Sequence, residues 1–370
     1  MQKYAFDESS LKPFLSLPAM QRALFSTAHR LFGLRFVKVD LEAEGIELYH
    51  PEVELYEVRE GEGPEERLVA LFLHDNYARA NKQSGAWMSE FREQSRNWNV
   101  YEFGDSTLHD VAITSSASSA NQLPIIINNN NFARGGDDAP CLLSFDDALT
   151  LFHEMGHGLH GMLSSVTYSR LSGTSVLRDF VELPSQLLEH WLRSTDVVLS
   201  EHATHYATGE KIDAEMLAKL NRARNFNEGF ATVEYTACAL VDQALHALPK
   251  DALDDLDINE FERVQLERLC MPKGICMRHR PFHFQHLFAS SGYAAAYYVY
   301  LWAEVLDADA FDTFLESGDV FDPPTAARLR EWIYSSGNSV EPSEAYRKFK
   351  GRDPTVEPML KKKGLLDVVA

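Results

Sequence analysis

The chain has 370 residues, of which 45% are hydrophobic and 24% charged, with a formal net charge of −20. This composition is typical of a soluble globular protein of one large domain or two ordinary ones. The acidic charge argues against nucleic acid or an anionic membrane surface as the main partner. The chain has no apolar stretch of about 18 residues and no signal-peptide pattern in MQKYAFDESSLKPF, so we expect a cytoplasmic protein that does not span a membrane.

The cysteines are scattered, and no pair has the spacing of a zinc ribbon or a thioredoxin-like motif. Isolated thiols are typical of proteins in a reducing compartment. We expect a packing role for each of them: Cys141, Cys238, Cys270 and Cys276.

The first part of the chain shows signals for one helix and a small sheet. An amphipathic helix is predicted over about residues 16–34, with Ser16 as a possible cap. Residues 53–59 and 67–74 form alternating or apolar runs around a turn that contains glycine and proline, which predicts a hairpin. A further buried strand is predicted over residues 122–128.

Beyond residue 144 the hydrophobic periodicity is almost entirely helical, and no internal repeat is present. The sequence therefore predicts a mainly α fold with a small β-sheet, of the α+β class, over residues 1–370. We expect the sheet within about 45–130, two site-bearing helices within 144–195, and a helical remainder over 210–370.

Residues 144–163 read SFDDALTLFHEMGHGLHGML and predict an amphipathic helix that begins at a capping box. His153 and His157 are four residues apart, so they share one helix face and can bind the same zinc ion at about 2.0–2.1 Å. Glu154 then lies beside the metal, where its carboxylate can take a proton from a zinc-bound water. This HExxH pattern is typical of metallopeptidases.

Three glycines follow in the same predicted helix, at Gly156, Gly158 and Gly161. A glycine inside a helix costs about 1 kcal/mol relative to alanine. Their number therefore predicts that another element packs very close to this helix. An HExxH pattern that arose by chance would not explain why three glycines lie in the same predicted helix.

A catalytic zinc usually has three protein ligands and one open position. Residues 178–191, RDFVELPSQLLEHW, predict a second helix with Asp179 as its cap and Pro184 at a helix start or kink. Glu182 falls in the first turns of this helix, either as the third ligand or as a carboxylate favoured by the helix dipole. Three other residues are candidates for supporting or packing roles: His160, Asp179 and His190.

The stretch FHEMGHGLHGML…LSGTSVLRDFVELPSQLLEHW resembles the M3 family of zinc oligopeptidases, which includes thimet oligopeptidase, oligopeptidase A and peptidyl-dipeptidase. The LSGT…RDFVE…EHW wording is most similar to the peptidyl-dipeptidase branch. The resemblance implies a zincin-like domain that hydrolyses short peptides. It also implies that one zinc ion per chain is bound by His153, His157 and Glu182, with Glu154 as the catalytic base.

Within residues 283–304, Tyr293, Tyr297 and Tyr300 follow a helical spacing after a Ser-Ser-Gly segment, which places them on one face of a predicted helix. Such a stripe is commonly core packing, but phenol and imidazole donors also suit a developing oxyanion. Tyr297 and Tyr298 are further candidates. The resemblance implies that three residues bind the substrate or stabilise the oxyanion: His286, Tyr293 and Tyr300.

Arg278 and Arg280 have two interpretations: they either hold the free carboxylate of a peptide or form structural salt bridges. Members of the resembled family are about twice as long as this chain. The resemblance thus implies that the usual N-terminal helical half is missing, and that this half or a partner chain completes the substrate channel. The rival interpretations are a non-catalytic peptide-binding fragment and a purely structural zinc site, which would need a fourth ligand.

Overall fold

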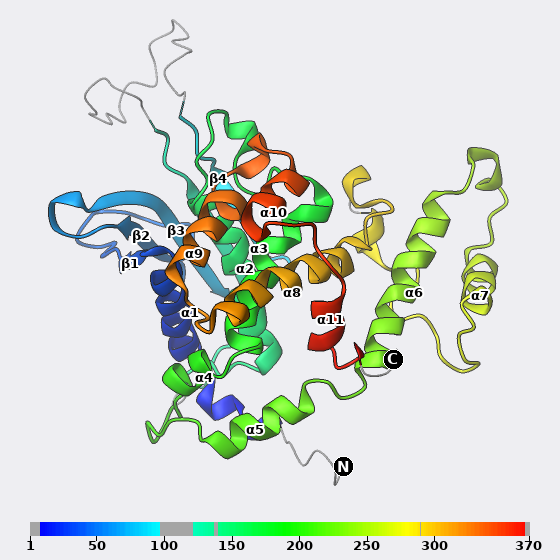
Figure 1. Ribbon diagram of the computed structural model, residues 1–370, viewed down its shortest axis with the longest axis horizontal. Helices are drawn as coiled ribbons and strands as arrows, with labels where there is room; N and C mark the ends of the chain where they lie inside the picture. Colours follow the sequence, from blue (N-terminus) through cyan, green and yellow to red (C-terminus); the bar gives the residue numbers. More distant parts are fainter. Residues whose placement is uncertain (1–7, 97–120, 137–139, 289, 367–370) are drawn as a thin grey trace, which may run out of the picture.

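The computed structural model describes residues 8–96, 121–136, 140–288 and 290–366. Within these ranges the protein is mainly helical with a small mixed sheet, which confirms the predicted fold class (Figure 1). None of the helices in this part of the chain is long and apolar enough to cross a membrane.

The sheet has the strand order β1-β2-β3-β5-β4. The predicted hairpin is confirmed as the antiparallel pair β2 and β3, and the predicted third strand pairs parallel to β3 but begins three residues later than expected. β1 and β4 were not predicted. The strand bounds are β1 Arg35–Lys38, β2 Glu54–Glu60, β3 Arg67–Tyr77, β4 Trp87–Arg92 and β5 Ile125–Phe132.

Alternate residues of β5 pack on opposite faces of the sheet. Ile126 belongs to the main hydrophobic core with the helices, whereas Ile127 packs in a small cluster with Leu55 and Leu73. Partly buried side chains of the segment before β2, among them Leu41 and Leu48, cover this second cluster. The face of the sheet that carries Ile126 therefore packs against the helices, and the face that carries Ile127 has only a small hydrophobic cluster.

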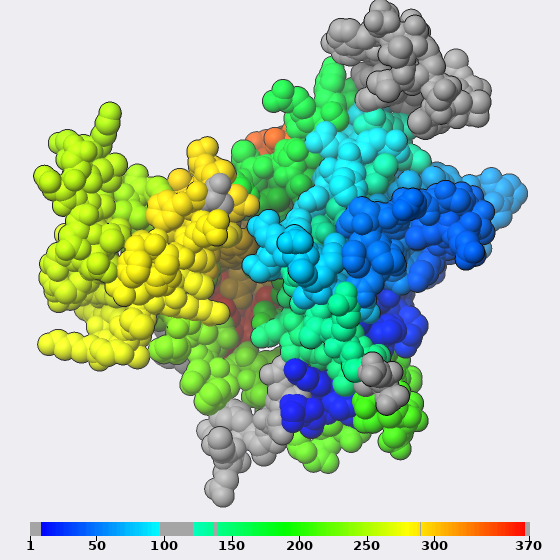
Figure 2. All heavy atoms as spheres, turned by 180° about the vertical axis from the view of Figure 1, so that it is seen from behind, coloured from blue at the N-terminus to red at the C-terminus, as the bar shows by residue number. Residues whose placement is uncertain are grey.

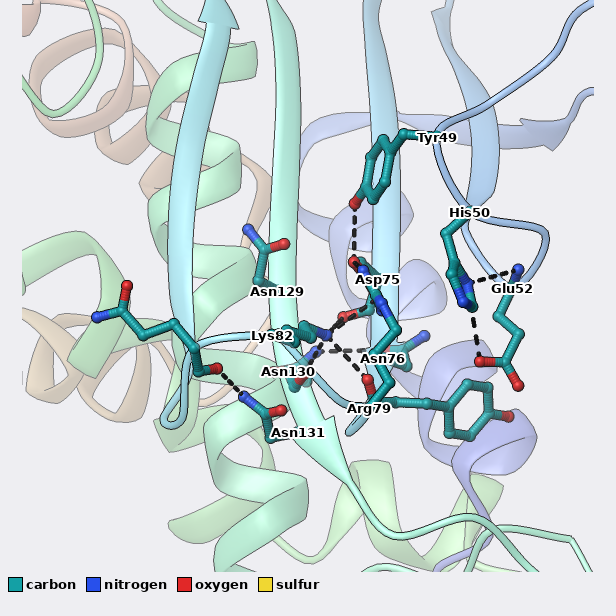
Figure 3. A network of polar contacts seen from close by, with 12 residues as sticks. Tyr49, His50, Glu52, Asp75, Asn76, Arg79, Lys82, Asn129, Asn130 and Asn131 are labelled. Atoms are coloured by element: carbon teal, nitrogen blue, oxygen red, sulfur yellow. Dashed lines mark hydrogen bonds and ion pairs between the residues drawn. The ribbon is translucent and has the colours of Figure 1, made fainter.

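A polar network fixes the carboxyl ends of β3 and β5 (Figure 3). Asp75 accepts two hydrogen bonds from the guanidinium of Arg79, at 2.6 and 2.7 Å. Lys82 donates to the Asp75 carboxylate at 2.9 Å and to backbone carbonyls of Tyr77 and Asn130. Hydrogen bonds with Arg79 and other donors hold the pKa of Asp75 far below its usual range, although burial opposes this shift. The turn after β3 is thereby anchored to the sheet beneath the helices.

Helix α1 spans Leu17–Phe32 and ends at Gly33, whose φ of 70° is left-handed. Ser16 occupies the predicted N-cap position, but its side chain makes no capping hydrogen bond. The first helical N–H, that of Leu17, instead donates to the carbonyl of Cys141 at 2.8 Å. The start of α1 is therefore fixed by a strand-like contact with the segment before the next helix.

Helix α2 spans Phe145–Met162, as predicted. Its capping box is complete, because Ser144 accepts from the Asp147 N–H and Asp147 accepts from the Ser144 N–H, both at 3.0 Å. The helix packs against β4 and β5 on one side and against α3 on the other. The predicted apolar stripe is buried: Ala148, Phe152, Met155, Leu159 and Met162.

Helix α3 spans Arg178–Arg193. The predicted cap is wrong, because Leu177 holds the N-cap position and Asp179 lies in the first turn. Pro184 lies inside the helix, where a missing N–H usually costs about 3 kcal/mol. Tertiary contacts outweigh that cost: α3 packs along both α2 and α8, and the Pro184 carbonyl accepts a hydrogen bond from Tyr334.

The helix predicted to carry Tyr293, Tyr297 and Tyr300 is wrong over most of that segment. Regular helix begins only at Val299, and Ala295 has a left-handed φ of 56°. The physical reason is the buried carboxylate of Asp242, which accepts hydrogen bonds from the N–H groups of Ala295 and Tyr297 at 3.2 and 2.9 Å. These N–H groups are therefore not available to a helix.

The remaining helices build the C-terminal part of the body and an arm of α6 and α7 that extends to one side in Figure 1. Their bounds are α4 Val197–His202, α5 Ala214–Ala223, α6 Glu228–His246, α7 Ile258–Arg268, α8 Val299–Ser317, α9 Pro323–Leu329, α10 Pro342–Lys350 and α11 Glu357–Lys362.

Candidate active site

Helices α2 and α3 approach most closely at Gly156. A Cβ atom on this glycine would lie 2.5 Å from both the Pro184 carbonyl oxygen and the Ser185 Cα. At Gly161 a Cβ would lie 2.6 Å from the side chain of Ile126. The close packing predicted from the glycines is thus confirmed, and it brings the backbone of α3 directly beside the HExxH segment.

The structure brings His153, His157 and Glu182 together at this crossing. The Glu182 carboxylate oxygen Oε2 lies 3.3 Å from His153 Nε2 and 3.2 Å from His157 Nε2. One ligand atom from each residue lies within 4.8 Å of the others. Two imidazole nitrogens and a carboxylate oxygen that converge in this way can hold a metal ion.

The electrostatics of the three side chains fit a cation. Burial alone lowers the pKa of His153, but hydrogen bonds with Glu182 and Glu189 raise it well above its ordinary value. Burial raises the pKa of Glu182, yet the neighbouring histidines lower it well below its ordinary value. The cluster therefore favours positive charge between its members, which a metal ion can supply in place of a proton.

Glu189 is a site residue that the sequence analysis missed. Its carboxylate lies 2.8 Å from His153 Nδ1. That contact orients the ring so that Nε2 faces Glu182, which is the usual second hydrogen bond of a metal-binding histidine. The signal was present in the sequence: Glu189 follows Glu182 by seven residues, which is two turns along the same helix face.

Glu154 lies at the same crossing and is 5% exposed. Its Oε2 atom is buried and has no hydrogen-bond partner among the described residues. Burial raises the pKa of this carboxyl, while the adjacent His153 and His157 oppose the shift. A buried carboxylate with a free oxygen beside a metal-binding cluster is suited to accept a proton from a bound water.

His286, Tyr293 and Tyr300 form an aromatic group across from α3. The His286 ring centroid lies 4.9 Å from that of Tyr293 and 6.0 Å from that of Tyr300. The pKa of Tyr300 is raised by burial and by the charge of Glu182. Burial lowers the pKa of His286, and the charge of Glu182 opposes that shift. Both side chains therefore lie within electrostatic reach of the proposed metal ligand.

Tyr297 contacts both this aromatic group and a small core. Its ring centroid lies 5.6 Å from that of His286 and 5.8 Å from that of Tyr300, and the side chain also packs against Cys238, Val241 and Met277. Tyr298 is 40% exposed at the start of α8.

The supporting candidates have other partners. His160 is fully buried beside Tyr334, and burial lowers its pKa to about 3. His190 pairs with Asp307, with 2.5 Å between Nε2 and the carboxylate. Asp179 lies in the first turn of α3.

The two arginines after α7 form ion pairs, as in the structural interpretation. Arg280 lies 2.8 Å from Glu262, and Arg278 lies 3.5 Å from Glu234.

Two histidines one helical turn apart, a glutamate beside them and a carboxylate from the neighbouring helix form a group of the HExxH class that could hold a metal ion. Comparison with known families assigns the chain more closely, because the model of peptidase family M3 matches residues 1–365. The chain belongs to peptidase family M3.

Curated relatives include both branches of the expected resemblance. The chain is 37% identical to a dipeptidyl carboxypeptidase of Salmonella typhimurium, over 98% of this chain and 49% of the relative. It is 32% identical to oligopeptidase A of Haemophilus influenzae, again over 98% of this chain and 49% of the relative. The chain therefore spans about half the length of the curated relatives it matches. A solved structure of a Pyrococcus furiosus carboxypeptidase is 15% identical, with a TM-score of 0.49, over 95% of this chain and 58% of that one.

Proposed function

We propose that this chain is the catalytic portion of a zinc-dependent peptidase that hydrolyses short peptides. The observation that carries the proposal is the convergence of His153, His157 and Glu182, whose ligand atoms lie within 4.8 Å of one another. Membership of peptidase family M3 and the buried Glu154 beside the cluster support it.

The proposed zinc site uses three residues of α2 and α3 as ligands and a fourth as an anchor. His153, His157 and Glu182 would hold the ion, and Glu189 would keep His153 in the tautomer whose Nε2 faces the ion. When bound, zinc supplies a Lewis acid that polarises the scissile carbonyl and lowers the pKa of a coordinated water.

Glu154 is proposed as the general base and then the general acid. Its free oxygen accepts the proton of the attacking water, and the same carboxyl then donates that proton to the leaving amine. The low exposure of Glu154 keeps bulk water from competing for the carboxylate.

His286 and Tyr300, with Tyr293 beside them, are proposed to donate hydrogen bonds to the carbonyl oxygen as it gains negative charge. Beside the larger effect of burial, the charge of Glu182 favours a higher pKa for both His286 and Tyr300, which supports a position of these two side chains near the proposed metal ligand. The side-chain amide Nε2 of Gln186 donates a hydrogen bond to the backbone carbonyl of Tyr300 at 3.3 Å, which links the tyrosine segment to α3.

We further propose that another polypeptide half, in the same or a partner chain, completes the substrate channel, because the curated relatives are about twice as long.

A cytoplasmic location is proposed from the free thiols of Cys270 and Cys276, which are exposed.

Cleavage of a free-acid peptide but not of its C-terminally blocked twin would identify a dipeptidyl carboxypeptidase, whereas cleavage of both would identify an endopeptidase.

The test of the proposal is the Glu154→Gln variant. An amide of the same shape cannot accept the proton, so turnover of an internally quenched peptide should fall to near background while zinc content stays at the wild-type level. Glu316→Gln, an exposed carboxylate on α8, serves as the matched control and should keep full activity. Hydrolysis by Glu154→Gln at a near wild-type rate would refute the assigned role.

A further inference from the structure

A cavity of about 910 Å³ lies among α3, α5, α6, α8 and α11. Figure 2 shows the molecule hollowed between the yellow-green arm and the sheet-bearing body, with red atoms of the C-terminal segment deep in the hollow. Gln186 and Tyr300 line this cavity, so it begins beside the proposed catalytic residues.

The cavity follows α3 and reaches the first turn of α2. On α3 it reaches Arg193, which follows Glu182 by eleven residues and lies on nearly the same helix face. On α2 it reaches Asp146, seven residues before His153. Arg193 lies 4.0 Å from Glu189, whose carboxylate lies 2.8 Å from His153 Nδ1, so this end of the cavity lies close to the metal-binding cluster.

Two guanidinium groups, of Arg193 and Arg224, line this end of the cavity. Arg224, just after α5, has Nε and Nη2 atoms that are shielded from solvent and have no hydrogen-bond partner among the described residues. Burial lowers the pKa of Arg224 to about 10, Asp196 opposes the shift, and Arg193 lowers the pKa further. Arg193 and Arg224 both line the same cavity.

No carboxylate of the described residues forms a close pair with these two groups. Asp196 is near Arg224, but its oxygens accept hydrogen bonds from Asn221 at 3.0 and 3.2 Å. The ion-pair partner of Arg193 is Glu189, at 4.0 Å.

The remaining charges of the cavity wall are mixed. Lys362 and Lys363 pair with acidic residues, among them Glu304 at 3.8 and 3.0 Å. Lys361, Asp146 and Asp312 complete the wall. The buried donors without partners are thus concentrated at Arg224.

We propose that Arg193 and Arg224 bind a carboxylate of a peptide that lies in the cavity. Guanidinium forks match a carboxylate with paired hydrogen bonds, so they suit either a C-terminus or an Asp or Glu side chain. The inference rests on the proposed peptidase function and adds a substrate preference to it.

The test measures binding rather than turnover, in the Glu154→Gln background so that the peptide stays intact. Three labelled octapeptides are compared by fluorescence anisotropy: one with a free C-terminus and no acidic residue, its C-terminal amide, and that amide with glutamate at the last position. The free acid should bind about 10- to 100-fold more tightly than the amide. Equally tight binding of the glutamate-containing amide would show that a side-chain carboxylate is also accepted.

Adding Arg224→Gln or Arg193→Gln should remove the preference. Arg193 is 42% exposed, so its replacement should leave the fold intact. Arg222→Gln is the matched control, because Arg222 is exposed two residues away and does not line the cavity. The proposal is overturned if neither peptide binds, if acid and amide bind equally, or if Arg222→Gln abolishes the preference too. A preference that persists in a wild-type chain without hydrolytic activity would instead contradict the proposed function alone.

Discussion

Replacing Gly156 with alanine tests whether the close approach of α2 and α3 builds the metal site. The new Cβ would lie 2.5 Å from the Pro184 carbonyl oxygen and from Ser185 Cα, so the backbone of α3 must retreat by about 0.9 Å to reach the 3.4 Å of ordinary contact. Because Glu182 is carried by that backbone and the histidines by α2, the retreat separates the ligands. A misplacement of about 1 Å can cost about 100-fold in rate.

The expected stability change is smaller than the expected functional change. Overpacking costs about 1–3 kcal/mol, while alanine in place of a helical glycine gains about 1 kcal/mol. Gly156→Ala should therefore lose at most about 2 kcal/mol of unfolding free energy, together with weaker zinc binding and about 100-fold lower kcat.

The assay combines chelator competition for zinc, peptide turnover and thermal denaturation. Gly158→Ala is the matched control, because it has the same helix-propensity gain and its Cβ would meet only side chains, those of Asn128 at 3.2 Å and Met162 at 3.5 Å. A Gly156→Ala protein that is more stable than wild type and binds zinc with unchanged affinity would refute the reasoning.

Tyr300→Phe should lower kcat by about 10²–10³-fold, the typical effect of one oxyanion donor, with little change in thermal stability because the ring remains; unchanged kcat would make Tyr300 a packing residue. Glu189→Gln should weaken zinc binding about 10–100-fold through loss of the anchor on His153, and a titration that shows wild-type affinity would exclude that role. Burial raises the pKa of Glu90 from 4.5 to about 7. The folded protein then keeps a proton that the unfolded chain has released, so its stability should fall as pH rises through this window. Glu90→Gln should flatten the difference in melting temperature between pH 5 and pH 8, and an identical pH dependence in both proteins would contradict this.

Local chemistry made the α2 part of the site predictable from the sequence. The capping box, the apolar stripe and the four-residue spacing of the histidines all lie within one helix, and the structure has that helix over Phe145–Met162. The glycines correctly indicated close packing, because a Cβ atom at Gly156 would meet the backbone of α3 and one at Gly161 would meet the side chain of Ile126. The contact between the Glu182 carboxylate and both histidines depends on tertiary packing, which the sequence indicated only through the family resemblance.

The errors have a common physical origin in long-range contacts. Pro184 was taken as a helix start or kink, yet packing of α3 against α2 and α8 keeps the helix continuous. The tyrosine segment was taken as helical, yet Asp242, more than fifty residues earlier in the chain, takes up the N–H groups of Ala295 and Tyr297. Neither contact has a signal within the segment that it reshapes.

The central claim is that His153, His157 and Glu182 together hold one zinc ion per chain. The most direct measurement is a chelator-competition titration of zinc with the wild type, Glu182→Gln and Glu154→Gln. The wild type and Glu154→Gln should each bind one zinc ion per chain with similar affinity. Glu182→Gln should bind zinc more than about 100-fold more weakly, because losing a direct ligand should weaken binding at least as much as losing Glu189, which only orients His153. Wild-type affinity in Glu182→Gln, or no stoichiometric zinc in the wild type, would contradict the claim.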